Sequence, residues 1–302
     1  MPLNESNHVK RVTDIPKPPS RPPDAHKGTA GLVLVVAGSR GMAGAAALVG
    51  NGALRAGAGL VRIATADAAL DTVAALAPCC TTAPLPDDGA CLRAEAAERV
   101  LELAEGQDAL ALGPGLGRTP AVGSVVRAVL EGLEIPVVLD ADGLNAVAAD
   151  AAETIARARN GLILTPHPGE AARLLGTSVK AIQADREAAA ERLARLGGLA
   201  RRGRRAGLGA VAVLKGAGTV VCDGRRLYVN ETGNPGMATA GAGDVLAGMM
   251  AAFLAARMSL FEAAVLAVWA HGRAGDLAAE RLGILGLTAL DLLGCVPEAL
   301  RV

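Results

Sequence analysis

The chain has 302 residues, of which 51% are hydrophobic and 20% are charged, and its formal net charge at pH 7 is zero. This composition indicates a globular protein with a large core, and it excludes a strongly basic protein that binds nucleic acid or an anionic membrane through charge. Aromatic residues make up only 1% of the chain, which also argues against the stacking platforms of nucleic-acid binders.

The cysteines and the N-terminal sequence indicate a reducing environment. Cys79 and Cys80 are adjacent and the other three of the five cysteines are scattered, a spacing that fits neither a zinc site nor a disulfide framework. The chain does not start with a secretory segment, and no uninterrupted apolar run reaches the ~18 residues that span a bilayer. We therefore predict a cytoplasmic protein with no membrane partner.

A polar, proline-rich segment, residues 1–26, precedes one predicted domain, residues 27–302. We expect this segment to be an extended tail or a packed arm rather than a domain. In the domain, apolar runs predict strands at 32–36, 60–64, 109–112, 136–140, 162–165 and 210–214, and a hairpin of residues 220–222 and 227–229. Helices are predicted at 45–56, 66–76, 94–104, in a stretch ending near 130, and at 179–195, 243–256, 260–279 and 288–293. The arginine-rich run at 201–205 is interpreted as a solvated helix end.

Buried strands that alternate with helices predict an α/β fold, with a mostly parallel central sheet covered by helices on both faces. In such folds ligands bind at the carboxyl ends of the strands. Each predicted strand runs directly into a loop that is marked by glycine or proline and carries polar residues. The sequence therefore predicts one functional edge of the sheet.

The functional centre is predicted in residues 233–244, a small-residue loop that enters an apolar helix. Glycines let backbone N–H groups approach a ligand, and a helix N-terminus favours an anion such as phosphate. Asp244 stands at this entry, where a carboxylate can take the proton of an alcohol that attacks a bound phosphoryl group. The alternative interpretation is a tight turn with Asp244 as the helix N-cap.

Lys215 ends a strand and opens the glycine-rich loop of residues 215–219. A lysine in this place can contact nucleotide phosphates as a point charge. The alternative is a solvated lysine at a strand end, but the neighbouring glycines and Thr219 favour a nucleotide site.

His167 lies between two prolines at another strand end, and Glu170 follows three residues later. The prolines fix the loop, so the imidazole is presented at a defined place. The sequence supports equally a functional histidine and a structural helix cap.

Asp140 and Asp142 follow a further strand, with Asn145 close behind. In phosphoryl-transfer sites such side chains hold Mg²⁺, here through water. Helix capping by Asp142, with Asn145 at the capping-box distance, is the alternative and is compatible with the first.

Two common nucleotide motifs do not fit. The glycines at 38, 41 and 44 have G-x-x-G-x-x-G spacing instead of the dinucleotide fingerprint, and no acidic residue ends the following strand. The chain also has no G-x-x-x-x-G-K-[ST] sequence, so a P-loop enzyme is excluded.

Taken together and in this order, the motifs resemble the ADP-dependent NAD(P)H-hydrate dehydratase family of the ribokinase-like superfamily, over about residues 27–300. The motifs that carry this resemblance are Gly38-Ser39 with Gly44-Ala45, Gly113-Pro114-Gly115-Leu116-Gly117, Leu139-Asp140-Ala141-Asp142-Gly143-Leu144-Asn145, Leu164-Thr165-Pro166-His167-Pro168-Gly169-Glu170, Leu214-Lys215-Gly216-Ala217-Gly218-Thr219 and the loop that ends at Asp244. The resemblance implies a ribokinase-like three-layer sandwich. It also implies repair of hydrated NADH and NADPH, in which the C6 hydroxyl is phosphorylated at the expense of ADP and elimination of phosphate restores the ring.

The resemblance also implies a role for each motif. Asp244 is expected to be the catalytic base, beside substrate. The amides of Ala240, Gly241, Ala242 and Gly243 are expected to form the anion hole. Lys215, Gly216, Ala217, Gly218, Thr219 and Gly243 are expected to hold the nucleotide. Ala45, Gly115, Gly117 and His167 are expected to line the substrate side, and Asp140, Asp142 and Asn145 to organise Mg²⁺ and its waters.

One departure is Met42, which stands where the family often has an aromatic residue and puts a stacking contact to substrate in doubt. The epimerase domain that often accompanies the family is absent, so that activity is expected on a separate chain. The resemblance further suggests a homotetramer, and the sequence alone does not choose between ADP and ATP. A small-molecule kinase of the same fold, acting on a thiazole or pyrimidine alcohol, and a non-catalytic nucleotide-binding regulator are the alternative functions.

Overall fold

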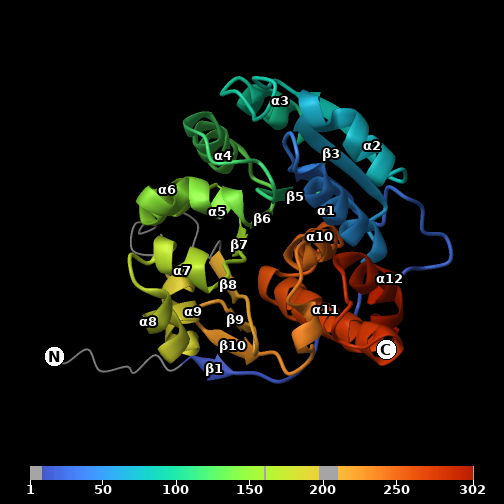
Figure 1. The fold of residues 1–302 in the computed structure, drawn as a ribbon, viewed down its shortest axis with the longest axis vertical. Coiled ribbons are helices and arrows are strands. Elements are labelled where there is room, and N and C mark those ends of the chain that lie inside the picture. The colour runs from blue at the N-terminus through green and yellow to red at the C-terminus, as the bar shows by residue number, and fades with distance from the viewer. Residues whose placement is uncertain (1–8, 160, 197–209, 302) are drawn as a thin grey trace.

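A ten-stranded sheet separates the helices into two layers in the computed structural model, which describes residues 9–159, 161–196 and 210–301 (Figure 1). The strand order in this part of the chain is β1-β10-β9-β8-β7-β6-β5-β2-β3-β4. The strands are β1 (Lys10–Arg11), β2 (Leu32–Val36), β3 (Leu60–Ala66), β4 (Thr81–Leu85), β5 (Ala109–Leu112), β6 (Val137–Leu139), β7 (Leu162–Leu164), β8 (Ala210–Leu214), β9 (Val220–Cys222) and β10 (Arg226–Val229).

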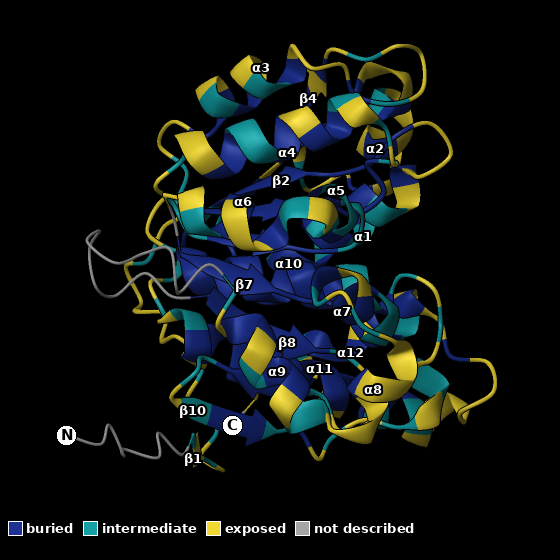
Figure 2. Ribbon diagram, turned by 90° about the vertical axis from the view of Figure 1, so that its left-hand side faces the viewer, coloured by how far each residue is buried: buried dark blue, intermediate teal, exposed yellow. Residues whose placement is uncertain are grey.

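One layer contains helices α1, α2, α10, α11 and α12, and the other contains α3 to α9. Figure 2 shows the second layer, with its outer surface exposed and the strands behind it buried. The helices are α1 (Ala43–Arg55), α2 (Leu70–Leu76), α3 (Ala96–Leu103), α4 (Pro120–Gly132), α5 (Asp142–Val147), α6 (Ala151–Arg157), α7 (Pro168–Leu174), α8 (Val179–Ala184), α9 (Arg186–Ala194), α10 (Ala242–Ala255), α11 (Leu260–Leu282) and α12 (Ala289–Ala299), with short 3-10 turns η1 (Asp67–Ala69), η2 (Ala148–Asp150) and η3 (Pro235–Met237).

The apolar runs of the sequence become strands because both faces of the sheet are covered. In β2, Val33 and Val35 belong to the core on the α10 side, whereas Leu34 and Val36 belong to the core on the opposite side. A strand buried on both faces needs apolar residues at every position, which is the pattern of β2, β5 and β8. The predicted three-layer α/β arrangement is confirmed.

Strands β8, β7, β6, β5 and β2 lie side by side and all run parallel. Their carboxyl ends therefore meet at one edge of the sheet, where the polar loops gather. Strand β9 pairs antiparallel with both β8 and β10, so the predicted hairpin is also present.

The packing of α10 on α1 depends on small residues. A Cβ at Gly248 would lie 2.0 Å from the carbonyl oxygen of Val49, and one at Gly52 would lie 2.7 Å from that of Val245. The two helices consequently approach closely, which fixes where the N-terminus of α10 meets the edge of the sheet.

Several predicted elements differ from the observed ones. The single helix expected over residues 179–195 is two helices, because Asp185 leaves the helical conformation and its side chain accepts a hydrogen bond from Ala188 N to cap α9. The short helix expected at 288–293 extends to Ala299 as α12. Strand β4 was not predicted, and the arginine-rich run 201–205 lies outside the described residues.

The N-terminal segment packs against the domain. Strand β1 pairs in parallel with β10 at one edge of the sheet, and Val12 and Ile15 pack against the core on the α10 side. No helix in the described ranges has the length and apolar character needed to cross a membrane.

Candidate active site

The loop of residues 233–244 leads into α10 at the predicted edge. Gly241 has φ 86°, a left-handed conformation that glycine adopts without strain, and the helix begins at the next residue. In the described part of the chain, the backbone amides of residues 240–244 donate no hydrogen bond. They and the positive end of the helix dipole form a cradle for an anion, as the sequence predicts.

Two side chains of helix α11 form hydrogen bonds with the loop of residues 233–244. His271 Nε2 donates to the carbonyl oxygen of Ala242 (2.9 Å), and burial lowers the pKa of His271 to about 4, so this ring is neutral. Asp276 accepts hydrogen bonds from Gly233 N (2.9 Å) and Asn234 Nδ2 (3.1 Å). Both side chains therefore fix the two ends of the loop rather than face a ligand.

Asp244 is the third residue of α10 and not its N-cap, since Gly241 takes that position and makes no side-chain cap bond. The capping alternative is therefore wrong. The pKa of Asp244 is raised to about 7, first by burial and then by the neighbouring carboxylate of Asp140, while Lys215 acts in the opposite direction. A carboxyl group with this pKa is suited to accept a proton near neutral pH.

Lys215 reaches across the edge of the sheet to Asp140. Its Nζ lies 2.7 Å from Asp140 Oδ1, and the two side chains are 19% and 2% exposed. Burial opposes the charge of Lys215, yet the carboxylates of Asp140, Glu170 and Asp244 raise its pKa above the ordinary value. A Cβ on Gly243 would stand 3.4 Å from Lys215 Nζ, so this ammonium group borders the amide cradle.

The 215–219 loop is held by Arg186, the first residue of α9. One terminal nitrogen of Arg186 donates to the carbonyl oxygens of Leu214 (3.0 Å), Lys215 (3.3 Å) and Gly218 (3.4 Å). Burial lowers the pKa of Arg186 below its ordinary value. Gly216, at φ 135°, passes so close that a Cβ there would lie 3.2 Å from the guanidinium group.

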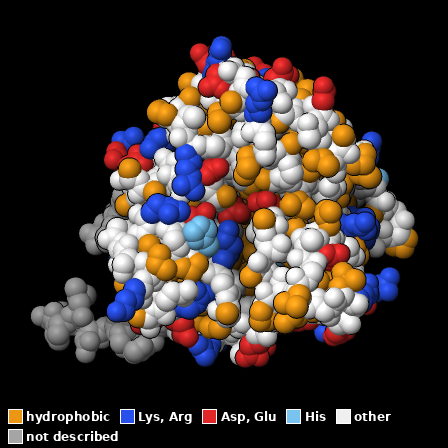
Figure 3. Space-filling model, in the orientation of Figure 1, with side chains coloured by type: hydrophobic (Ala, Val, Ile, Leu, Met, Phe, Trp, Pro, Cys, Tyr) orange, Lys and Arg blue, Asp and Glu red, His pale blue; other side chains and the backbone are white. Residues whose placement is uncertain are grey.

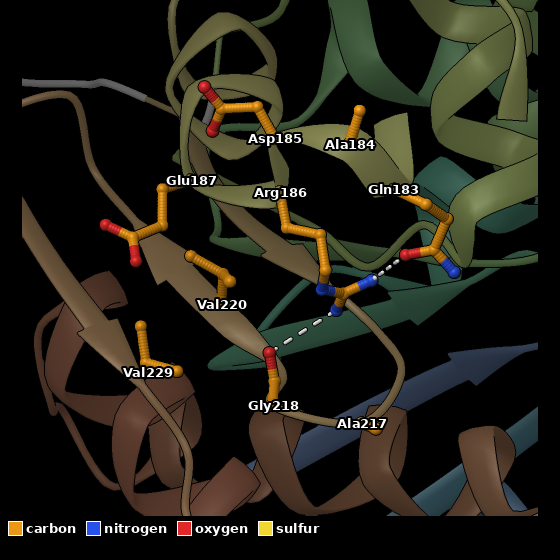
Figure 4. A pocket seen from close by; sticks show the side chains of 9 residues that line it. All are labelled: Gln183, Ala184, Asp185, Arg186, Glu187, Ala217, Gly218, Val220 and Val229. Atoms are coloured by element: carbon orange, nitrogen blue, oxygen red, sulfur yellow. Dashed lines mark hydrogen bonds between the residues drawn. The ribbon is translucent and has the colours of Figure 1, made fainter. Parts of the chain in front are cut away.

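A pocket of about 390 Å³ lies beside this loop, on the α8–α9 side (Figure 4). In Figure 4 the Arg186 side chain crosses the pocket from α9 toward the loop and forms part of its wall. The loop itself is closed by Thr219, whose hydroxyl donates to the carbonyl oxygen of Gly216 (2.9 Å). The pocket is lined by Gln183, Ala184, Asp185, Arg186, Glu187, Ala217, Gly218, Val220 and Val229.

The residues expected to organise Mg²⁺ have protein partners. Asp142 accepts hydrogen bonds from Gly117 N (3.0 Å) and from Arg118 Nε (3.1 Å), and Asn145 Oδ1 accepts from Arg173 Nε (3.0 Å). No group of three or more His, Cys, Asp or Glu side chains in the described ranges forms a metal site. These contacts fit direct coordination poorly and leave only a role through water.

The helix-capping alternative for Asp142 is also wrong. Asp142 is the first residue of α5, and the N-cap is Ala141, which has φ 51° and no side chain that can cap. Instead, the carboxylate of Asp142 connects α5 to Gly117 on the neighbouring loop. An alanine in this rarely populated region of backbone space is a mark of a constrained site.

His167 is the N-cap of α7. Its Nδ1 accepts a hydrogen bond from Gly169 N (2.9 Å), and Glu170 Oε2 accepts one from the backbone N–H of His167 (2.8 Å). The structural alternative is thus present, while half of the side chain stays exposed. Burial, followed by the charges of Lys215 and Arg173, lowers the pKa of His167, so the ring is neutral near pH 7.

The residues expected on the substrate side come from three places: Ala45 lies in the first turn of α1, Gly115 and Gly117 lie in the 113–117 loop, and His167 is the N-cap of α7. A Cβ at Gly115 (φ 65°) would be 3.1 Å from Ala45 Cβ and 3.0 Å from Met42 Cβ, so the first glycine loop touches the 113–117 loop. Ser39 Oγ donates to Gly115 O (2.7 Å) and fastens this contact. The side chain of Met42, which contributes to this contact, is 48% exposed.

Four residues of this edge were absent from the predicted site: Arg186, Arg118, Arg173 and Glu170. Arg118 and Arg173 bond Asp142 and Asn145, and Glu170 is buried beside Lys215 with its pKa raised by that burial. Figure 3 shows the outcome on the surface, where acidic and basic side chains and a histidine gather around a central hollow. For Arg118, the sequence offered one signal of a place in the site, which is its position directly after the glycine loop of residues 113–117.

The fold is the ribokinase-like α/β fold, and at one edge of its sheet an amide cradle at a helix N-terminus lies beside a lysine and a carboxyl group. The chain belongs to the NAD(P)H-hydrate dehydratase family, whose model matches residues 33–298.

Named relatives agree with this family. The chain is 43% identical over 286 residues to the bifunctional NAD(P)H-hydrate repair enzyme of Moorella thermoacetica. The matched region covers 94% of this chain and 52% of that protein. It is 42% identical to the ADP-dependent (S)-NAD(P)H-hydrate dehydratase of Neisseria meningitidis serogroup B, over 90% of this chain and 86% of that one. The chain spans about half the length of the bifunctional relatives.

Among solved structures, the chain resembles the ADP/ATP-dependent NAD(P)H-hydrate dehydratase of Bacillus subtilis, which was co-crystallised with ATP and Mg²⁺. The TM-score is 0.78 and the sequence identity 32%, with 93% of this chain and 92% of that chain covered.

Proposed function

We propose that this protein is an ADP-dependent NAD(P)H-hydrate dehydratase. The observation that carries the proposal is a single carboxyl group, Asp244, with a pKa of about 7 beside a cradle of amides that have no acceptor within the described chain. Such a pair suits the transfer of a phosphoryl group to an alcohol. The family relationship supports the hydrate as the substrate, and the alcohol in this proposal is its C6 hydroxyl.

The proposed first step is phosphoryl transfer. Asp244 accepts the proton of the C6 hydroxyl while the hydroxyl oxygen forms a bond to the β-phosphorus of ADP. The bond between that phosphorus and the bridging oxygen breaks, and this oxygen leaves with AMP. The amides of residues 240–243 hold the transferring phosphoryl group, where their dipoles meet the developing charge.

The second step is elimination. The C6–O bond breaks with its electron pair on the phosphate, and loss of a proton from the neighbouring ring carbon restores the double bond. The products are NAD(P)H, phosphate and AMP, and the hydrate supplies the water that is formally removed.

In this proposal Lys215 and the 215–219 loop hold the nucleotide. The ammonium group of Lys215 borders the cradle, and Arg186 fixes the loop through its carbonyl groups. In the same proposal Ala45, Gly115, Gly117 and His167 face the substrate. Ala45 and the 113–117 loop adjoin on the β5–β2 side of Asp140, whereas His167 follows β7 on the side of Lys215.

Mg²⁺ is proposed to arrive with the nucleotide phosphates and to reach Asp140 and Asp142 only through water, because both carboxylates already bond protein donors. When bound, the ion supplies positive charge to the phosphates. A homotetramer and cooperation with an epimerase remain predictions from the family resemblance, and a cytoplasmic location remains a prediction from the cysteines and the N-terminal sequence.

The test is the recovery of reduced nicotinamide absorbance when the protein is incubated with NADH hydrate, ADP and Mg²⁺. We expect recovery together with one phosphate released per NADH formed. Asp244→Asn should lose turnover by at least about a thousandfold and still bind ADP, because the base is lost while the cradle stays.

The matched control is Asp71→Asn, an exposed carboxylate on α2, which should leave turnover unchanged. Failure of the wild-type protein to restore absorbance would reject the proposed activity. Near-normal turnover in Asp244→Asn would reject Asp244 as the base and leave the activity standing.

A further inference from the structure

Two arginines on different elements are joined through one acidic and one amide side chain. Arg118 Nε donates to Asp142 Oδ1 (3.1 Å), Asn145 Nδ2 donates to the same oxygen (3.4 Å), and Arg173 Nε donates to Asn145 Oδ1 (3.0 Å). Arg118 follows the 113–117 loop, whereas Arg173 belongs to α7. We call these four side chains the arginine bridge.

The hydrogen bonds of the arginine bridge orient both guanidinium groups and leave their terminal nitrogens available. Each arginine uses its Nε in the bridge, and in the described part of the chain neither terminal nitrogen donates a hydrogen bond. Arg118 is 65% exposed, so a ligand can reach it. A guanidinium group with free terminal N–H donors is a bidentate partner for phosphate.

The arginine bridge lies beside residues that are proposed to face the substrate. Asp142 also accepts a hydrogen bond from Gly117, one of the proposed substrate residues. A Cβ at Gly169 would be 3.9 Å from a terminal nitrogen of Arg173, and the charges of Arg173 and Arg118 both lower the pKa of His167. With Asp142 as the one carboxylate in the bridge, the set carries a net positive charge.

We propose that Arg118 and Arg173 form an anion subsite that binds a phosphate group of the dinucleotide substrate. This inference rests on the proposed function for the identity of the substrate. The phosphate can belong to the diphosphate linkage, which NADH hydrate and NADPH hydrate share, or to the 2′-phosphate of NADPH hydrate alone. Arg118 and Arg173 bond Asp142 and Asn145, whereas Lys215 bonds Asp140, so the subsite uses hydrogen-bond partners other than those of the phosphoryl-transfer centre.

The test compares Arg118→Gln, Arg173→Gln and the double variant with the wild-type protein, using both hydrates. We expect KM for the hydrate to rise about tenfold to hundredfold, the range of a lost charge-assisted hydrogen bond, with kcat and the KM for ADP little changed. Arg118→Lys, which keeps the charge without the planar fork, should give an intermediate KM. Added salt should raise KM less in the double variant than in the wild-type protein.

The pattern across substrates identifies the phosphate. A rise for both hydrates supports the diphosphate as ligand, and a rise for NADPH hydrate alone supports the 2′-phosphate. A KM within about twofold of wild type for both hydrates would overturn the subsite, as would a fall in kcat at constant KM.

Arg99→Gln is the matched control, since Arg99 is an exposed arginine on α3 whose partner is Glu102, and it should change neither constant. Calorimetric binding of NADH and NADPH to the same variants separates this inference from the proposed activity. If the wild-type protein fails to dehydrate the hydrates, weaker dinucleotide binding in the variants still supports the subsite, and unchanged binding rejects it.

Discussion

The carboxyl group of Asp244 is subject to opposing electrostatic influences. Burial disfavours its charged form and the carboxylate of Asp140 adds to that effect, whereas Lys215 favours the charged form. Because Lys215 is itself paired with Asp140 at 2.7 Å, its charge compensates Asp244 only in part. The pKa of about 7 follows from this balance, and it sets the pH range in which the group can act as a base.

The turnover of the hydrate should therefore depend on pH in one direction. The base must be deprotonated, so kcat/KM should fall about tenfold per pH unit below pH 7 and level off above it. His167 has a lowered pKa and His271 one of about 4, so neither accounts for a transition near pH 7. The measurement is kcat/KM between about pH 3.5 and 9, with circular dichroism at each pH to verify folding.

A profile that stays flat through pH 7 would contradict a base with this pKa. A transition shifted to near pH 4 would instead mean that the bound nucleotide or Mg²⁺ cancels the burial effect on Asp244.

At the level of single residues, the sequence allows prediction of side chains that follow a strand directly. Asp140 directly follows β6 and Lys215 directly follows β8, and their side chains meet because the carboxyl ends of parallel strands share one edge. Asp244 approaches this pair from the first turn of α10. Arg186 could not be predicted, since its partners are backbone carbonyl groups about 30 residues away and an arginine on a polar helix usually faces water. The same holds for Arg173, whose partner Asn145 lies on another element.

Among the elements, the 215–219 loop depends most on a distant side chain. Arg186 on α9 binds the carbonyl groups of Lys215 and Gly218, and in the described part of the chain the amides of Gly216, Ala217 and Gly218 donate no hydrogen bond. The orientation of the 215–219 loop is therefore determined by where α8 ends and α9 begins. Asp185 makes that break and caps α9, which places Arg186 in the first helical position.

Arg186→Ala should weaken ADP binding by about tenfold, because three carbonyl groups lose their shared donor and the loop gains alternative conformations. Calorimetry with ADP measures the dissociation constant, and thermal unfolding measures any loss of stability. Arg186→Lys should recover part of the affinity. Arg192→Ala is the matched control on the same helix, since within the described residues Arg192 makes one hydrogen bond, to Leu175 O at 3.5 Å.

An unchanged ADP dissociation constant in Arg186→Ala would show that the loop keeps its shape without this arginine. Equal weakening by Arg192→Ala would attribute the effect to the helix rather than to the contacts with the loop.

There are physical reasons why the sequence patterns did not predict some of the observed elements. Strand β4 contains Pro84, which argues against a central strand, yet β4 lies at the end of the sheet, where an edge strand tolerates proline. The break between α8 and α9 falls in a helix-favouring sequence, and only the cap formed by Asp185 reveals it. Long, buried strands such as β2 and β8 were predicted within a residue because each position is apolar.

On the scale of the whole molecule, the sheet extends beyond the predicted domain. Backbone hydrogen bonds from Lys10 N to Arg225 O and from Val12 N to Leu227 O, both 2.8 Å, attach β1 to β10. Arg11 also pairs with Glu187, which adds little because both side chains are exposed. Since β10 belongs to the same hairpin as β9, this arm supports the strands that follow the 215–219 loop.

Deletion of residues 1–26 should therefore lower the free energy of unfolding by about 2–4 kcal/mol, from two backbone hydrogen bonds and the partly buried side chains of Val12 and Ile15. It should also expose the edge of β10 and promote aggregation. Urea unfolding measures the first effect and light scattering the second. Deletion of residues 1–8, which keeps β1, is the control and should change neither. An unfolding free energy unaffected by the longer deletion would mean that β1 adds nothing to the domain, and residues 1–26 would then be a tail in the energetic sense.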